Sequence, residues 1–369
     1  MSDVTAETPD TFPSVVIDEE GFPQFGELRV ADPAVGREIL QNIYRHESGV
    51  FYTRLQDQQH LVEAFDEPLV LQHLHSPPKN SENPMAPWRG VLPFGSEVSF
   101  LLSSLRVDEW DRFHGRLENQ MPFVFSRKAQ AQFFENCDDF EDESFTFAGH
   151  TFAAESYWPD FSEGEQPEYW TEIYHKEQDP GWNLHAPAPA LADVLPRLKM
   201  PKSRILVLGC GEGEDAAFFA NAGHVVTAVD FSEEALKRAR EKWSTGSPKG
   251  TPATAKIQWQ QADALDDNTE WYGSFDMIFE HTCYCAINPS LRSTLVKNWR
   301  RYLTPQGQLM GVFFCMDRPQ GPPFGGTEWE LRQRLKKDYQ FLFWGRWKTS
   351  APARKGKEVF VLAQRMNRS

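Results

Sequence analysis

The sequence predicts two domains, the second of which is an α/β domain with a doubly wound, mostly parallel sheet. The chain has 369 residues, more than a single hydrophobic core usually serves. Beyond about residue 200, short apolar segments alternate with segments of helical length, and this order is typical of βαβ units in a parallel sheet. A glycine-rich turn follows the first apolar segment, as in domains that bind a ligand at the carboxyl edge of such a sheet.

The apolar segments of the C-terminal half are expected to form buried strands, because they are short and bounded by turns. They are residues 204–208, 225–229, 257–261, 275–279 and 309–314. Helices are expected over residues 215–222, from Ser232 onward and over 289–303. Ser232 is placed to cap its helix, with acidic residues in the first turn and basic residues further along, which complements the helix dipole.

The N-terminal half is expected to form an α+β accessory domain over residues 16–155, after a disordered tail over residues 1–15. The remaining residues, 156–369, form the expected C-terminal domain. Helices are predicted over residues 36–46, 107–116 and 126–136, strands over 50–55 and 59–65, and a hairpin over 145–152. This half carries no recognisable catalytic motif, so the candidate functional residues are expected in the C-terminal domain.

Charge and composition exclude several classes of protein. The net charge of −15 and the absence of a basic cluster disfavour nucleic-acid binding. No apolar run is long enough to span a membrane, and the polar, acidic N-terminus does not resemble a signal peptide. The five cysteines match no disulfide framework or zinc pattern. A cytoplasmic protein with reduced thiols and no metal is therefore expected.

The strongest motif is ILVLGCGEGED over residues 205–215, followed by VVTAVDFSEEAL over residues 225–236. Gly209, Gly211 and Gly213 form a turn between a strand and a helix, where the backbone approaches a ligand too closely for a Cβ atom. Asp230 ends the next strand about 20 residues on, where it is placed to accept hydrogen bonds from ribose hydroxyls. The motif therefore predicts a site for a nucleoside-containing cofactor.

Two cofactors use this arrangement, and the spacing favours one of them. A dinucleotide site requires G-x-G-x-x-G, whereas position 214 is Glu and position 213 is Gly. A glutamate at the helix N-terminus would also oppose a pyrophosphate. S-adenosylmethionine carries no phosphate and has a cationic sulfonium, so nearby acidic residues are compatible with it. The sequence favours S-adenosylmethionine over a nicotinamide dinucleotide.

Residues after the later strands complete the expected cofactor site. Asp263 follows the third strand and is placed to accept a hydrogen bond from the adenine amino group. Glu280 and His281 end the fourth strand at the carboxyl edge, where ligands of such sheets bind. The other residues assigned to the cofactor site are Asp215, Phe231 and Ala264.

With these segments in order, the chain resembles the thiopurine, small-thiol and halide methyltransferases over about residues 165–365. The glycine loop is similar to this family's version, which lacks an acidic residue two positions before the first glycine; here that position is Val207. GHVVTAVDFSEEAL, CAINPSLR and QGPPF are similar to further segments of the family. The resemblance implies a Rossmann-like seven-stranded sheet with an antiparallel last strand. It also implies that Trp170 and Trp182 pack on the cofactor as a lid.

The resemblance implies that Arg292, and less directly Arg354, occupies a position that orients or deprotonates a thiol acceptor. A cation beside a thiol raises its thiolate fraction without a strong base. In a second interpretation, Glu280 or His281 acts as a base and takes the proton of the thiol. In a third, both residues only hold the cofactor or the loop. Tyr284 is expected to line the acceptor pocket.

The predicted function is methyl transfer from S-adenosylmethionine to a small thiol or sulfide, such as hydrogen sulfide or methanethiol. Three alternatives remain open: a non-catalytic sensor of S-adenosylmethionine, a methyltransferase for a larger metabolite or protein, and one for a metalloid. The last arises because Cys283 and Cys285 supply two soft ligands, although buried packing explains both cysteines as well. The sequence does not indicate an oligomeric state.

Overall fold

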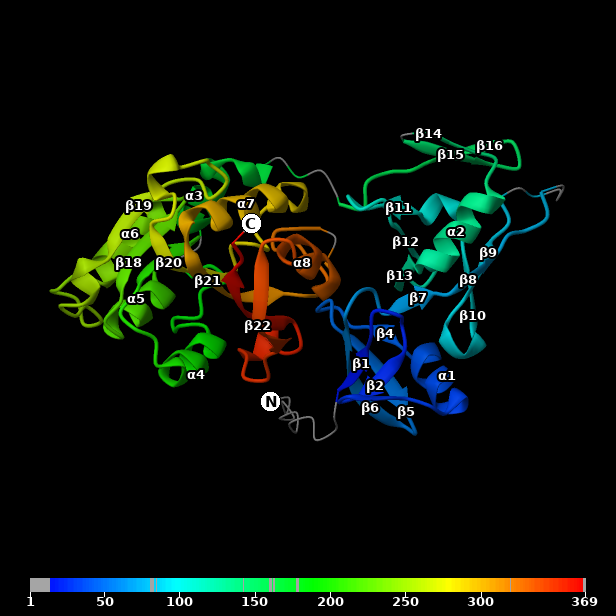
Figure 1. Cartoon of the computed structure of the whole chain (residues 1–369), viewed down its shortest axis with the longest axis horizontal. Helices are drawn as coiled ribbons and strands as arrows, with labels where there is room; N and C mark the ends of the chain where they lie inside the picture. The colour runs from blue at the N-terminus through cyan, green and yellow to red at the C-terminus, as the bar shows by residue number, and fades with distance from the viewer. Residues whose placement is uncertain are drawn as a thin grey trace. The chain divides into compact units, whose positions relative to one another are not determined.

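The computed structural model describes residues 14–79, 83, 85–141, 143–158, 161, 163–176, 179–318 and 320–367. The chain divides into two compact units (Figure 1). The first is bounded by Met1 and Pro159 and includes Thr327–Trp329, and the second comprises Asp160–Gly326 and Glu330–Ser369. Residues 1–13 of the predicted tail lie outside the described residues. Val15, which the prediction assigned to the tail, is instead buried in the first strand.

The N-terminal unit is built mainly from short strands. One described sheet has the order β3-β2-β1-β6-β5-β4, with bounds Leu28–Arg29, Pro23–Phe25, Val15–Ile17, Gln58–Ala64, Phe51–Leu55 and Tyr44–Arg45. The others are β10-β9-β8 (Glu97–Phe100, Trp88–Val91, His73–His75), β11-β12-β13-β7 (Arg106–Val107, Phe113–Arg116, Pro122–Phe125, Leu69–Leu71) and β14-β15-β16 (Asp139–Glu141, Ser144–Phe147, His150–Ala153). Helices α1 (Pro33–Gln41) and α2 (Arg127–Asn136) pack on these strands.

The helix predicted over residues 107–116 is wrong. Two antiparallel strands, β11 and β12, occupy this segment, joined by a turn in which the Asp108 carboxylate accepts hydrogen bonds from the backbone N–H groups of Trp110 and Arg112. Phe113 is buried in β12, and a Cβ on Gly115 would lie 2.3 Å from the Phe123 ring. The helical spacing of the apolar residues does not decide the conformation of this segment. An Asx turn, followed by close packing of the strands, holds the backbone in an extended hairpin instead.

The C-terminal unit contains a sheet of described strands in the order β19-β18-β17-β20-β21-β23-β22. Their bounds are Gln258–Gln261, Val225–Asp230, Arg204–Leu208, Phe275–His281, Leu303–Phe314, Glu358–Arg365 and Tyr339–Arg346. Strands β19 to β21 pair in parallel, whereas β23 runs antiparallel to β21 and β22. The predicted doubly wound α/β class is confirmed for this unit.

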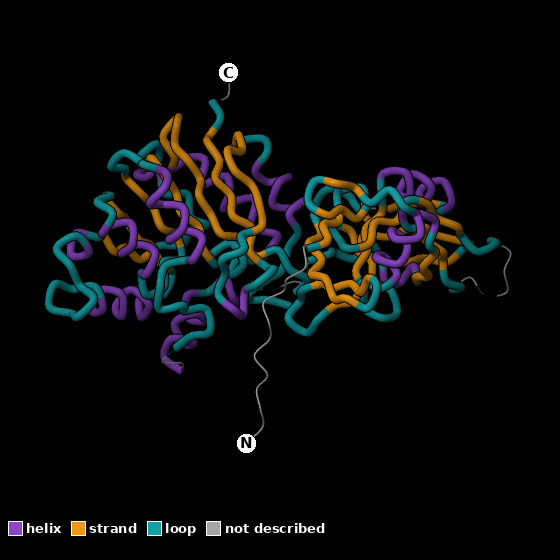
Figure 2. Tube along the Cα trace, turned by 90° about the horizontal axis from the view of Figure 1, so that it is seen from below, coloured by secondary structure: helices purple, strands orange, loops and turns teal. Residues whose placement is uncertain are grey.

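Helices cover both faces of this sheet, because alternate residues of each strand point to opposite faces. On one face, strand residues such as Ile205 and Val207 pack with helices α4 (Pro189–Leu198) and α5 (Glu214–Asn221). On the other, Leu206 and Leu208 share a core with α7 (Arg292–Tyr302) and with Leu331 and Leu335 of α8 (Glu328–Leu335). Figure 2 shows these strands side by side between helices. Helices α3 (Pro167–Lys176) and α6 (Glu233–Lys242) contact each other.

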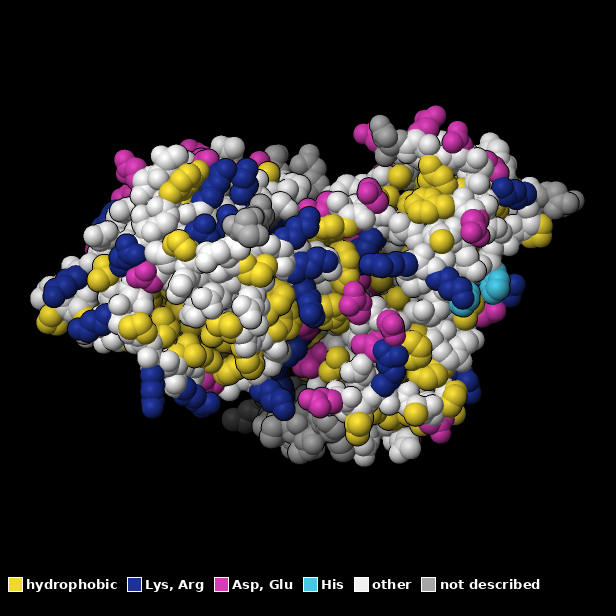
Figure 3. All heavy atoms as spheres, viewed as in Figure 1, with side chains coloured by type: hydrophobic (Ala, Val, Ile, Leu, Met, Phe, Trp, Pro, Cys, Tyr) yellow, Lys and Arg dark blue, Asp and Glu magenta, His cyan; other side chains and the backbone are white. Residues whose placement is uncertain are grey.

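The surface carries both signs of charge. On the face shown in Figure 3, Lys and Arg side chains occur on both units among Asp, Glu and uncharged side chains. Among the described helices, none combines the length and apolar character needed to cross a bilayer.

Candidate functional site

A cavity of about 500 Å3 lies at the carboxyl edge of the sheet in the C-terminal unit. Its walls include residues that directly follow four strands, namely Gly209 after β17, Phe231 after β18, Ala262 after β19 and Thr282 after β20, and also Met316, two residues after β21. Ligands of open α/β sheets bind at this edge. The topology therefore brings the segments singled out in the sequence to one place.

The glycine loop forms one wall of the cavity. Gly209 and Gly211 both have positive φ angles, of 60° and 52°. A Cβ on Gly209 would lie 2.7 Å from the Cβ of Cys283, so a larger residue would separate the loop from the end of β20. Gly213 does not line the cavity; it precedes α5, and a Cβ there would lie 2.4 Å from Trp259. Its role is to let the helix begin close to the sheet.

Asp230 occupies the end of β18 beside this loop. Its two carboxylate oxygens accept hydrogen bonds from the backbone N–H groups of Gly211, at 2.8 Å, and Ser232, at 2.9 Å. Burial raises the pKa of Asp230, while these backbone donors oppose the shift. A carboxylate has about four acceptor positions, so Asp230 retains capacity for ligand hydroxyls after making both bonds.

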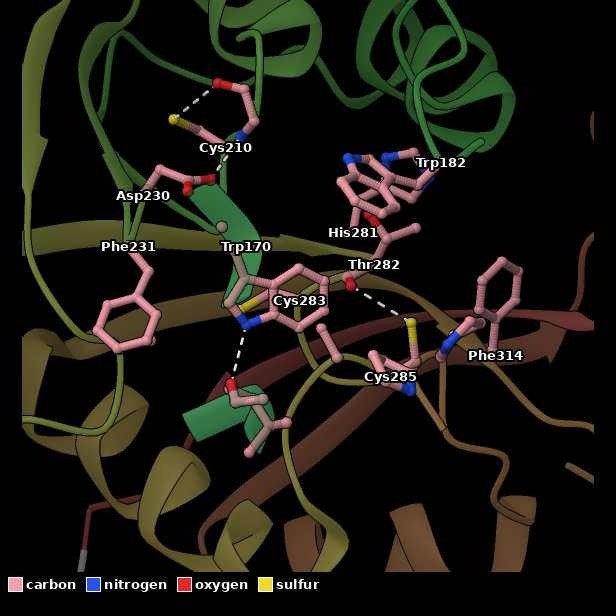
Figure 4. A pocket seen from close by; sticks show the side chains of 18 of the residues that line it. Trp170, Trp182, Cys210, Asp230, Phe231, His281, Thr282, Cys283, Cys285 and Phe314 are labelled. Carbon is pink, nitrogen blue, oxygen red and sulfur yellow. Dashed lines mark hydrogen bonds between the residues drawn. The ribbon is translucent and has the colours of Figure 1, made fainter. Parts of the chain in front are cut away.

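Asp263, Ala264 and Phe231 also line the cavity. The Asp263 carboxylate accepts a hydrogen bond from the Leu265 N–H at 2.8 Å, and burial raises the pKa of Asp263. Figure 4 shows Asp230 and Phe231 at one side of the cavity and Cys285 and Phe314 at the opposite side. The cavity therefore has two ends, here called the acidic end, around Asp230 and Asp263, and the acceptor end, around Phe314.

An aromatic cluster from α3 and the following loop covers part of the cavity. The rings of Trp170 and Trp182 meet edge to face with centroids 5.8 Å apart, and the Trp182 indole N–H donates to the Tyr174 hydroxyl at 3.2 Å. The Trp170 indole N–H donates to the Gly164 carbonyl at 2.8 Å. Both tryptophans line the cavity, where their apolar surfaces are available to exclude water from a ligand.

The acceptor end combines apolar side chains with three cations. The cavity is lined by Phe314, Met316, Pro322 and Pro323 and by the cations Arg318, Arg354 and Lys357. The Arg354 guanidinium lies 5.3 Å from the centre of the Phe314 ring, which places it at this end. Burial, together with the charges of Arg318 and Arg354, lowers the pKa of Lys357. Within the described residues, neither Arg318 nor Lys357 has a carboxylate at ion-pair distance. This end of the cavity is therefore suited to an anion with an apolar part.

Arg354, His281 and Asp215 form a hydrogen-bonded chain along the wall. The Arg354 Nη1 lies 2.6 Å from the His281 Nε2, and the His281 Nδ1 lies 2.8 Å from an Asp215 carboxylate oxygen. The other Asp215 oxygen accepts from the Ala188 N–H at 2.7 Å, and the Arg354 Nη2 donates to the Trp182 carbonyl at 2.7 Å. This chain connects the tryptophan cluster with the glycine-loop helix and the acceptor end.

Arg292 lies elsewhere, which corrects its expected place at the acceptor. Its side chain does not line the cavity; it is fully buried and donates to both carboxylate oxygens of Glu330 at 3.1 Å. Further bonds go to the carbonyls of Tyr284 and Gly325. These contacts occupy the guanidinium, so Arg292 holds the loop after β20 rather than facing the cavity.

Glu280 and Tyr284 also lie outside the cavity lining. The Glu280 carboxylate is buried and accepts a hydrogen bond from the Tyr284 N–H at 2.6 Å, while its other oxygen has no partner. The Tyr284 hydroxyl donates to Glu330 at 3.2 Å. Glu280 points away from the cavity because successive residues of a strand point to opposite faces and His281 lines the cavity.

Burial raises the pKa of Glu280 from 4.5 to about 7, which predicts a pH-dependent stability. Between these values the folded state binds more protons than the unfolded state, so the stabilisation falls as pH rises through the window. We expect Glu280→Gln to be more stable than the wild type above pH ~7, by up to about 3 kcal/mol, and similar to it at low pH. Urea denaturation at several pH values measures this difference. Glu270→Gln, at an exposed glutamate, is the matched control, and equal pH profiles for wild type and Glu280→Gln would contradict the assignment.

Cys210, Cys283 and Cys285 line the cavity as free thiols. Burial raises the pKa of each, that of Cys285 to about 12. In the part of the chain that the structure describes, no group of three or more His, Cys, Asp or Glu is arranged to hold a metal ion. Cys283 and Cys285 are both buried, as expected for packing residues.

The acidic end fits S-adenosylmethionine. Gly209 and Gly211 let the backbone of the loop approach a ligand closely. Asp230 offers acceptor positions for the ribose hydroxyls, and Asp263 offers a carboxylate for the adenine amino group. The tryptophans supply apolar surface. Acidic side chains are compatible with a sulfonium and amino group, whereas a pyrophosphate would be repelled.

Two cations of this site, Arg318 and Lys357, were not predicted from the sequence. Arg318 lies two positions before the QGPPF segment, and Lys357 follows Arg354 by three, so both are close to segments that the sequence singles out. Nothing local distinguishes them from surface cations. Only the approach of the two loops at the cavity reveals them.

Comparison with known proteins agrees with this geometry. Residues 165–367 match the family described as thiopurine S-methyltransferase. A probable thiol methyltransferase 2 of Arabidopsis thaliana is 31% identical over 39% of this chain and 61% of its own length. Thiocyanate methyltransferase 1 of the same plant is 29% identical over 42% and 65%.

A thiopurine S-methyltransferase of Pseudomonas fluorescens is 24% identical over 46% of this chain and 82% of its own. Among solved structures, a 1,6-didemethyltoxoflavin-N1-methyltransferase of Burkholderia thailandensis has a TM-score of 0.44 and 19% identity, over 63% of this chain and 100% of its own. The chain spans less than two thirds of the length of the plant relatives. The match of the family to more than half of the chain confirms the predicted resemblance: this protein belongs to the thiopurine S-methyltransferase family.

Proposed function

We propose that the protein transfers a methyl group from S-adenosylmethionine to a small thiol or sulfide that binds as an anion beside Arg354. The observation that carries this proposal is the two-ended cavity, in which an acidic end suited to the cofactor adjoins an acceptor end with Arg318, Arg354 and Lys357. Hydrogen sulfide and methanethiol are the acceptor types we expect. The names of the plant relatives support a soft sulfur acceptor, since these proteins are called thiol and thiocyanate methyltransferases.

The cations at the acceptor end would ionise a thiol rather than remove its proton directly. A guanidinium has no acceptor atom, so Arg354 cannot serve as a base. It would stabilise the thiolate electrostatically and thereby lower the pKa of the bound thiol, whose ordinary value is about 8.5 in the cysteine reference case. The proton then leaves to solvent as the acceptor binds.

Bound S-adenosylmethionine supplies an electrophilic methyl group on its sulfonium. The protein's task is to hold the thiolate in line with that methyl carbon and to exclude water, and such positioning accounts for a large part of the acceleration in reactions of this kind. Arg354 would hold the sulfur, and Trp170 and Trp182 would shield the reacting atoms. The sulfur–carbon bond forms as the bond to the sulfonium breaks, and S-adenosylhomocysteine is the second product.

A direct test is an acceptor screen with methyl-labelled S-adenosylmethionine and the full chain. The panel holds sulfide, methanethiol, thiocyanate, halides and an aromatic thiol, with gas chromatography to detect volatile methylated products. We expect turnover on at least one small sulfur nucleophile. Turnover only on an oxygen, nitrogen or carbon acceptor would overturn the proposal, and cofactor binding without transfer to any acceptor would favour a sensor.

Asp230→Asn is expected to weaken binding of S-adenosylhomocysteine about 10- to 100-fold, because hydrogen bonds to a charged acceptor contribute roughly 1.5–3 kcal/mol. The amide would also set an N–H donor against the Gly211 or Ser232 N–H. Isothermal titration calorimetry measures the change. Glu233→Gln is the matched control, since Glu233 lies on the adjacent helix and does not line the cavity. Unchanged affinity in Asp230→Asn would remove Asp230 from the cofactor site.

A further inference from the structure

We propose that His281 is a positioning residue for Arg354, held as the neutral Nδ1–H tautomer, and that it does not accept the proton of the acceptor. The inference rests on the proposed function only in taking Arg354 as the group that binds the acceptor. It assigns to His281 and Asp215 a role in fixing the direction of the Arg354 guanidinium. Nothing in the family resemblance assigns such a role.

The tautomer follows from the chemistry of the partners. Arginine only donates hydrogen bonds, so the His281 Nε2, 2.6 Å from the Arg354 Nη1, must present its lone pair to the guanidinium. The remaining ring proton is then on Nδ1, which donates to the Asp215 carboxylate at 2.8 Å. A carboxylate only accepts when ionised, so both bonds require the same tautomer.

Asp215 anchors one end of the hydrogen-bonded row formed by Asp215, His281 and Arg354. Its second oxygen accepts the Ala188 N–H at 2.7 Å, just before α4, and the residue itself lies in the first turn of α5. The exposed fractions are 15% for the Asp215 side chain, 9% for His281 and 7% for Arg354. Water therefore competes little with these bonds, and orientation is transmitted from the helix to the guanidinium.

Arg354 is held on its other side by the tryptophan cluster. Its Nη2 donates to the Trp182 carbonyl at 2.7 Å, its Nη1 also lies 3.6 Å from the buried Glu358 carboxylate, and the residue lines the cavity. Two fixed bonds on one planar guanidinium define its plane and direction. The acceptor site is thus assembled only when the tryptophan loop and His281 are both in place.

The same bonds argue against His281 as a base. To accept a proton on Nε2, the ring would have to break its bond to Arg354 and become a cation beside the Arg354 charge. Nδ1 already carries a proton and faces Asp215. Neither ring nitrogen has a lone pair free for an acceptor in this arrangement.

The first test compares His281→Ala with His281→Gln on the acceptor that gives turnover. A glutamine oxygen can accept from Arg354 while its amide nitrogen donates to Asp215. We expect His281→Ala to lower kcat/KM roughly 10- to 100-fold through loss of orientation, chiefly by raising KM for the acceptor. His281→Gln should recover most of this loss and keep the wild-type pH profile. If His281→Gln is as impaired as His281→Ala, with a limb of the pH–rate profile lost, His281 is a base and the inference fails.

The second test needs no turnover. In protein labelled with 15N in its imidazole rings, the His281 resonance, identified by its disappearance in His281→Gln, should show a protonated Nδ1 and an unprotonated Nε2 near neutral pH. His224 is an internal control with the opposite expectation, because its Nδ1 accepts the Ser203 N–H at 3.2 Å. An Nε2–H tautomer or an imidazolium at His281 would overturn the inference. If the acceptor screen fails but this spectrum is as expected, the proposed function fails and the positioning geometry stands.

Discussion

Replacing Arg354 by methionine is expected to lower kcat/KM for the acceptor about 100- to 1000-fold, the range observed when one preorganised donor to a reacting anion is removed. Arg354 lines the cavity and is directed toward it by His281 and Trp182. Methionine has a similar length and removes the charge. The loss should shrink as pH rises toward the pKa of the free thiol, because the acceptor then ionises without help.

Steady-state kinetics at several pH values check this result. Arg346→Met is the matched control, since Arg346 also donates to loop carbonyls, those of Cys315 and Gly356, but does not line the cavity. Binding of S-adenosylhomocysteine should change much less than turnover in Arg354→Met. Equal losses in the two variants would show that Arg354 acts through the loop rather than on the acceptor.

Replacing Arg292 by leucine should lower the free energy of unfolding by about 3 kcal/mol or more, the cost of breaking a buried ion pair. Burial alone would raise the pKa of Glu330, but Arg292 and Arg334 hold it below its ordinary value. Without Arg292, the Glu330 carboxylate keeps only one of these two cations. The carbonyls of Tyr284 and Gly325 also lose their donor.

Chemical denaturation measures this change, with the cofactor concentration held constant. Arg204→Leu is the control, because Arg204 makes a similar paired contact with Asp276 at the surface. Exposed pairs of that kind contribute about 1 kcal/mol or less. If Arg292→Leu keeps wild-type stability but loses turnover, Arg292 acts at the acceptor, as the family resemblance implied.

The cofactor half of the site could be predicted because its signals are local. Gly209 and Gly211 lie in a strand–turn–helix segment where positive φ angles require glycine, and Asp230 ends the neighbouring strand. Ser232 caps its helix by accepting a hydrogen bond from the Ala235 N–H. Each of these features depends on residues within a few positions of one another, so the order of residue types is enough to indicate them.

The acceptor half could not be predicted in the same way. His281 lies 66 positions from Asp215 and 73 from Arg354, and no sequence pattern joins them. Arg292 illustrates the converse, since a charged residue in a recognisable segment faces Glu330 rather than the cavity.

The sequence by itself thus determined the α/β class, the family and the glycine turn with its carboxylate, because strand and helix periodicity and backbone sterics act over short stretches of chain. Only the tertiary structure decided which cations reach the cavity and which become buried ion pairs. The outcome depends on which loops meet at the carboxyl edge of the sheet and, for Arg292, on the Glu330 carboxylate of a distant helix, which pairs with it.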